Sequence, residues 1–219
     1  MTDESLRSLV ERQVGFASLG LYEGVTTGFA AARASWHRHD EPDYRWLLSM
    51  TARARMRDHW ETHRPAEGWT VEGNAALMGQ TILVSPDRRV TLRLLKENPN
   101  VHPGGVPCAG HNAARQAAWR QDPLPSLSLT LHPGIAAVTT ECLLLWDCAW
   151  DEGDPRVSTR VVHTTEPGRY GDRVPIDLSF RIDPSGSMYD QLVFDGAAEM
   201  EDLFPNINQK DNEGDASGE

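Results

Sequence analysis

The sequence has few lysines, few cysteines and no long hydrophobic run, and each shortage excludes a class of protein. No apolar run is long enough to span a bilayer, and no basic segment followed by an apolar one opens the chain, so we expect neither a transmembrane helix nor a signal peptide. The three cysteines, Cys108, Cys142 and Cys148, form no CxxC pair, which is typical of a reduced cytoplasmic protein. Only two of the 21 basic residues are lysines. This bias toward arginine indicates a GC-rich, actinobacterial-like genome.

The formal net charge of −11 is distributed unevenly along the chain. Eight acidic residues and a single lysine lie after position 194, whereas the preceding part is close to neutral. A nearly neutral body with an acidic end has no general attraction for nucleic acid or for anionic lipid. We therefore expect another protein as the partner, and neither nucleic acid nor a membrane. The acidic end lacks regular apolar spacing, which predicts disorder over residues 195–219.

The N-terminal part of the sequence is predicted to be helical. Apolar residues recur at helical spacing from Leu6 to Val14, and Gly20, Gly24 and Gly28 follow at intervals of four in an apolar segment. An acidic cap and a proline predict a second helix over residues 40–63. Its large apolar side chains predict a buried stripe formed by Trp46, Leu47, Met50, Ala54 and Trp60.

After residue 68 the apolar period changes from that of a helix to that of a strand. Residues 81–84 and 90–94 flank a proline turn and predict a hairpin, residues 109–121 predict a helix, and three strands follow at 141–150, 157–163 and 176–182. The sequence thus predicts an α+β fold with N-terminal helices, a mainly antiparallel sheet with one intervening helix, and a disordered acidic C-terminal tail. We expect a helical region (1–67) packed with a sheet region (68–194) as one domain, followed by the tail (195–219).

Four histidines in the N-terminal half are candidate metal ligands: His37, His39, His59 and His63. The last two are one helical turn apart, a spacing at which two imidazoles can bind one zinc ion. Glu61 lies between them, where neither HExxH nor HxxEH places its glutamate. The alternative interpretation is a pair of surface histidines at a helix end. No cofactor is expected beyond such a zinc ion.

The loop before the predicted helix 109–121 contains a candidate nucleophile. Cys108 lies three residues before His111 and next to a helix start, two features that favour a thiolate. His102, Cys108 and His111 are alternatively a partial zinc site. The structural interpretation is a turn and helix cap shaped by glycine and proline.

Arginines are concentrated on the second predicted helix. If Arg53, Arg57 and Arg64 share a face, their guanidinium groups can bind phosphate or the carboxylates of an acidic partner. Salt bridges to acidic residues of the same chain are the alternative.

The acidic end carries four apolar residues at the spacing of a docking peptide: Met200, Leu203, Phe204 and Ile207. Pro205 limits any helix there to a short turn. No catalytic motif is complete. The sequence therefore favours a non-enzymatic interaction or regulatory protein, bacterial or phage-derived, that binds its partner through this segment. The alternative function is a metal-dependent hydrolase built on the four histidines.

Overall fold

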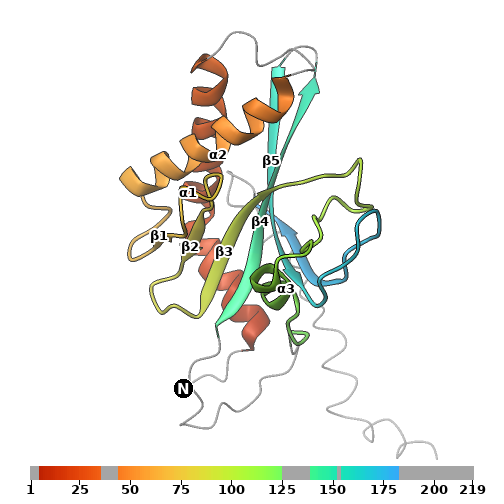
Figure 1. Cartoon of the computed structure of the whole chain (residues 1–219). Helices are drawn as coiled ribbons and strands as arrows, with labels where there is room; N and C mark the ends of the chain where they lie inside the picture. Colours follow the sequence, from red (N-terminus) through yellow and green to blue (C-terminus); the bar gives the residue numbers. More distant parts are fainter. Residues whose placement is uncertain (1–4, 36–43, 125–138, 152–153, 183–219) are drawn as a thin grey trace, which may run out of the picture. The chain divides into compact units, whose positions relative to one another are not determined.

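The computed structural model describes residues 5–35, 44–124, 139–151 and 154–182 (Figure 1). All of them belong to one compact unit, Met1–Met188, and a second unit, Tyr189–Glu219, lies outside the described residues. The elements in order are α1 (Leu6–Ser35), α2 (Arg45–Thr62), β1 (Thr70–Glu72), β2 (Ile82–Val84), β3 (Val90–Lys96), α3 (Ala113–Trp119), β4 (Thr140–Asp151), β5 (Asp154–Thr164) and β6 (Ile176–Arg181).

The strands form a six-stranded sheet in the order of the sequence, β1-β2-β3-β4-β5-β6. Every neighbouring pair is antiparallel except β3 and β4, which run parallel from the pair Val90–Thr140 to the pair Lys96–Trp146. Parallel neighbours need a crossover connection, and α3 lies within that connection. The mainly antiparallel α+β fold predicted from the sequence is confirmed. The parallel pair and the short strand β1 were not predicted.

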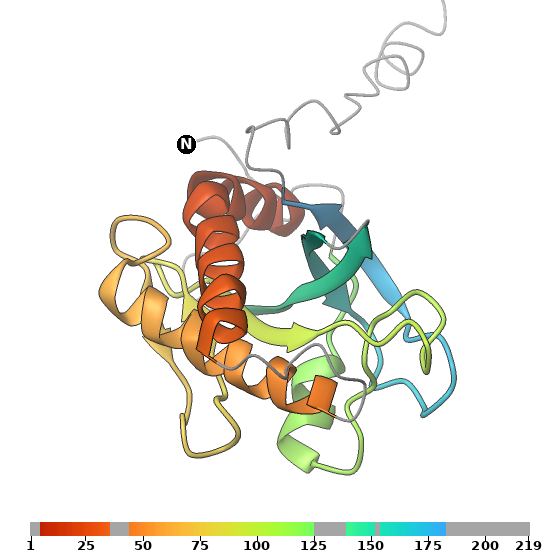
Figure 2. The same ribbon diagram turned by 90° about the horizontal axis from the view of Figure 1, so that it is seen from above.

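Two hydrophobic clusters lie on opposite faces of the sheet. On β4, Leu144 and Trp146 belong to the cluster formed with α1 and α2, whereas Leu143 and Leu145 belong to the cluster formed with Trp119 of α3. Successive side chains of a strand point to opposite faces, so the two helical layers cover different sides. Figure 2 shows the strands between α1 and α3.

The glycines of α1 permit a close approach of α2. A Cβ atom at Gly24 would lie 2.0 Å from Nε1 of Trp60, and one at Gly28 would lie 2.6 Å from the backbone nitrogen of Met56. Trp60 is fully buried and donates from Nε1 to the carbonyl oxygen of Gly20 over 2.9 Å. The glycine spacing in the sequence therefore marks the contact line between the two helices.

Of the predicted buried stripe of α2, only Trp60 is fully buried, whereas Leu47 and Met50 are half-buried. Trp46 is 61% exposed and Ala54 is also exposed, while the buried residues are Leu48, Ala52, Met56 and Trp60. These four are spaced at intervals of four along the helix. The small side chain of Ala52 and the flexible one of Met56 suit the narrow space beside α1.

Within the described residues, no helix combines the length and the apolar character that crossing a bilayer requires. The predicted tail, residues 195–219, lies outside the described residues.

Candidate functional site

A pocket with a volume of about 500 Å³ lies between α2, the loop of residues 73–80, β3 and the start of α3. Its lining consists of arginines, amides and apolar side chains: Arg53, Leu77, Met78, Gln80, Arg93, Leu94, Leu95, Asn112, Ala114 and Arg115. This volume is typical of a small-molecule site. No carboxylate is among the described lining residues.

Three arginines from three elements converge on the pocket: Arg53 on α2, Arg93 on β3 and Arg115 on α3. Burial lowers the pKa of Arg53. Burial, followed by the charge of Arg93, lowers the pKa of Arg115, and the charge of Arg53 acts in the same direction. The Nε atoms of Arg93 and Arg115 are buried without a hydrogen-bond partner in the described structure. The pocket thus holds three like charges and unused donors, a combination that favours an anion.

The position of Arg115 is set by its own helix. Asn112 caps α3 by accepting a hydrogen bond from the backbone nitrogen of Arg115 over 3.0 Å. The guanidinium of Arg115 lies 4.9 Å from the ring centre of Trp119 and donates from Nη2 to the carbonyl oxygen of Cys108 over 3.3 Å. Trp119 is fully buried and donates to the carbonyl oxygen of Pro107. The side chain is therefore preorganised, which lowers the entropic cost of binding.

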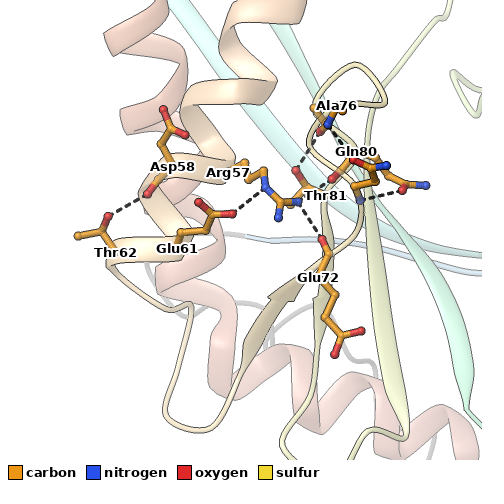
Figure 3. Close-up of polar contacts among 10 residues, drawn as sticks. Arg57, Asp58, Glu61, Thr62, Glu72, Ala76, Gln80 and Thr81 are labelled. Carbon is orange, nitrogen blue, oxygen red and sulfur yellow. Dashed lines mark hydrogen bonds and ion pairs between the residues drawn. The ribbon is translucent and has the colours of Figure 1, made fainter.

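Arg57 holds the loop of residues 73–80 against α2 (Figure 3). Its Nη1 donates to the carbonyl oxygens of Glu72 and Gln80, over 2.9 and 2.7 Å, and so joins the two ends of the loop. An ion pair of 2.7 Å connects its Nε to Glu61. Because Arg53 lies one helical turn before Arg57, the two side chains link α2 to the pocket and to the loop that borders it.

The three arginines expected to bind phosphate or an acidic partner have different positions. Arg53 lines the pocket, Arg57 is engaged with the loop, and Arg64 is exposed beyond the end of α2. Their role in binding stays a prediction, and of the three only Arg53 lines the pocket. Arg93 and Arg115 were not part of the predicted set. The sequence signal for Arg93 is a charged residue in mid-strand between the apolar residues Leu92 and Leu94. These leucines belong to the cluster with α1 and α2, so Arg93 lies on the opposite face, which α3 covers.

Of the four predicted metal ligands, His59 and His63 lie together with their rings stacked at 5.0 Å between centres. Glu61 is paired with Arg57. Among the described residues, no group of three or more histidines, cysteines or acids is arranged to hold a metal ion. His37 and His39 lie outside the described residues, so the zinc site and the hydrolase built on it stay predictions.

The stacked histidines predict a loss of stability on acidification. Burial, followed by the charge of His63, lowers the pKa of His59 below the value of about 6.5 expected in the unfolded chain. The neutral form of His59 contributes fully to the stability of the folded state above that unfolded pKa. This contribution is lost as the pH falls through the folded pKa, because the unfolded state then binds the proton more readily.

We expect the free energy of unfolding, measured with urea, to fall less between pH 7.5 and 5.5 for His59→Gln than for the wild type. An NMR titration should show a higher pKa of His59 in His63→Gln. An unchanged pKa there would mean that the stacked rings do not interact electrostatically.

Cys108 and His111 differ in burial, and their role as a catalytic pair stays a prediction. Cys108 packs beside the cluster under α3, and His111 is exposed at the loop end. A different histidine pairs with an acid: Nδ1 of the buried His163 lies 2.6 Å from Oδ1 of the half-buried Asp177, whose other oxygen accepts a hydrogen bond from the backbone nitrogen of Leu124. This pair connects β5, β6 and the segment after α3, which indicates a structural role.

Leu143 of β4 pairs with Val162 of β5 in an antiparallel register. Cys142 precedes Leu143 and therefore lies close to His163, which follows Val162. Burial, followed by the charges of Asp177 and Glu141, raises the pKa of the Cys142 thiol well above its usual range. A protonated thiol enclosed in the core is a poor nucleophile.

The predicted docking residues, Met200, Leu203, Phe204 and Ile207, lie outside the described residues, and their role stays a prediction.

No protein-family model, no curated protein and no solved structure matches the chain.

Proposed function

We propose that the protein is a non-enzymatic binding protein that recognises an anionic group, phosphate or carboxylate, in the arginine pocket. The observation that carries this proposal is the convergence of Arg53, Arg93 and Arg115 on one pocket, with two buried Nε donors that have no partner among the described residues. Guanidinium groups bind phosphate and carboxylate oxygens with paired hydrogen bonds, which gives both affinity and orientation.

Electrostatics support the same proposal. Burial, followed by repulsion from the other guanidinium groups, lowers the pKa of Arg115, and an anion in the pocket offsets that repulsion. It also supplies acceptors to donors that the fold leaves unused, and an unsatisfied buried donor costs about 1–3 kcal/mol. The sequence favours an interaction or regulatory protein. An anion-binding pocket is compatible with that prediction, because the bound anion can belong to a ligand that regulates the protein.

The direct test is a titration of the full-length protein with inorganic phosphate, followed by calorimetry and by the NMR signals of arginine Nε–H groups. We expect the signals of Arg93 and Arg115 to shift on binding. Arg53→Gln should weaken phosphate binding by about tenfold, because a hydrogen bond to a charged group contributes about 1.5–3 kcal/mol. The side chain of Arg53 has no hydrogen bond or ion pair in the described structure, so its replacement should leave the fold intact.

A matched control is Arg55→Gln, because Arg55 is on the same helix, is exposed and pairs with Asp58 at 3.6 Å. It removes the same charge from the protein without touching the pocket. Equal weakening by both variants would show that phosphate senses only the general charge of α2, and the proposed site would then be wrong.

A further inference from the structure

The loop of residues 73–80 places two large apolar side chains at the pocket. Leu77 and Met78 are 61% and 62% exposed, and both line the pocket beside Leu94 and Leu95 of β3. Exposed apolar side chains next to one another, at the edge of a polar site, are typical of a surface that contacts a ligand.

The loop is preformed by its own hydrogen bonds. The backbone nitrogen of Gly79 donates to the carbonyl oxygen of Ala75 over 2.9 Å, and that of Leu77 donates to the carbonyl oxygen of Asn74 over 3.0 Å. The side chain of Gln80 accepts from the backbone nitrogen of Asn74 over 3.1 Å. Together with the contacts of Arg57 in Figure 3, these bonds fix the loop before any ligand binds.

Met78 adopts a left-handed backbone conformation, with φ at 55°. This conformation costs a residue with a side chain about 1–2 kcal/mol, whereas glycine adopts it freely and asparagine adopts it more readily than most residues. The side chain of Met78 is largely exposed, so burial in the core does not compensate for this cost. A strained residue with an exposed apolar side chain beside a pocket points to a role in binding.

We propose that the ligand is a small organic phosphate whose apolar substituent packs on Leu77 and Met78 while its phosphate contacts Arg53, Arg93 and Arg115. This inference rests on the proposed anion-binding function and adds the chemical class of the ligand. A phosphate monoester carries close to two negative charges near neutral pH, which suits three guanidinium groups better than a single carboxylate does.

The test compares inorganic phosphate with hexyl phosphate on the full-length protein by calorimetry. We expect hexyl phosphate to bind at least roughly tenfold more tightly, because its chain loses contact with water. Met78→Asn should remove most of this difference, so that the ratio of the two affinities falls toward one. Asparagine tolerates the left-handed conformation, so the loop should keep its shape. Phe16→Asn, at a side chain 70% exposed on α1, is the control and should change neither affinity.

Each outcome has a separate meaning. Equal affinities for the two phosphates in the wild type would overturn the apolar contact while leaving the anion site intact. A preference for hexanoate over hexyl phosphate, measured in the same way, would overturn the assignment to a phosphate. Binding of none of these anions would refute the proposed function itself.

Discussion

Replacement of Arg93 with methionine is expected to weaken phosphate binding strongly and, in the absence of ligand, to stabilise the fold. Arg93 is the strand-borne member of the pocket, and its buried Nε has no partner among the described residues. Loss of its charged hydrogen bonds should weaken phosphate binding roughly 10- to 100-fold, the range that about 1.5–3 kcal/mol represents.

The stability change has the opposite sign for a physical reason. Methionine has a similar length and removes both an unsatisfied donor and a positive charge that acts on Arg115. Replacing buried charges with apolar groups of similar size is often neutral or stabilising. We expect a gain of about 1 kcal/mol in the free energy of unfolding, or a melting temperature about 2–4 °C higher.

Thermal unfolding with and without phosphate measures both effects in one experiment. The wild type should gain stability when phosphate is added, because the ligand binds the folded state, and Arg93→Met should gain much less at the same phosphate concentration. Arg181→Met, at an exposed position on β6, is the control and should retain the wild-type response to phosphate. A variant that is less stable than the wild type would show that Arg93 has a structural partner, and the site would need another explanation.

Gly24→Ala is expected to cause a large loss of stability. The new Cβ would lie 2.0 Å from Nε1 and 2.2 Å from Cε2 of Trp60, which is fully buried and cannot move into solvent. Any shift of the indole also weakens its hydrogen bond to the carbonyl oxygen of Gly20. Overpacking of about 1–3 kcal/mol and a lost bond of about 1 kcal/mol exceed the gain of about 1 kcal/mol in helix propensity.

We therefore expect Gly24→Ala to lower the free energy of unfolding by about 2 kcal/mol, measured with urea. A double-mutant cycle with Trp60→Leu tests the cause, because the smaller leucine leaves room for the new methyl group. The double variant should be less destabilised than the sum of the single variants. Thr27→Ala, at an exposed position of the same helix, is the control and should be close to neutral. Strict additivity would mean that the methyl group and the indole do not compete for space.

The sequence predicts local structure well where a single periodicity decides it. Gly20, Gly24 and Gly28 share one face of the helix that the sequence predicts there, and in the structure this face meets α2, while the hairpin of β2 and β3 followed from its proline turn. The stripe of α2 was misassigned, because the apolar pattern suggested Trp46 and Ala54 whereas the space beside the glycines selects Ala52 and Met56. Hydrophobicity alone does not report the distance between two helices.

The candidate site was harder to predict because its parts are distant in the sequence. Arg53 was identified from the density of arginines on one helix. Arg93 and Arg115 join it only through the parallel pairing of β3 with β4 and the crossover that contains α3. Nothing local in the sequence distinguishes a parallel neighbour from an antiparallel one. The conformation of Met78 was equally hidden, since methionine carries no turn signal.

The parallel pairing of β3 with β4 also bears on the rates at which the site forms and disappears. The chain from residue 97 to residue 139 must close before Val90 can pair with Thr140, and such a closure is entropically costly and slow. Arg115 lies within this closing segment, so the arginine pocket is complete only after the closure. A ligand that needs all three arginines has little to bind in the folding transition state if the closure comes late. Under that order of events, it prolongs the lifetime of the folded protein by slowing unfolding, and it leaves the folding rate nearly unchanged.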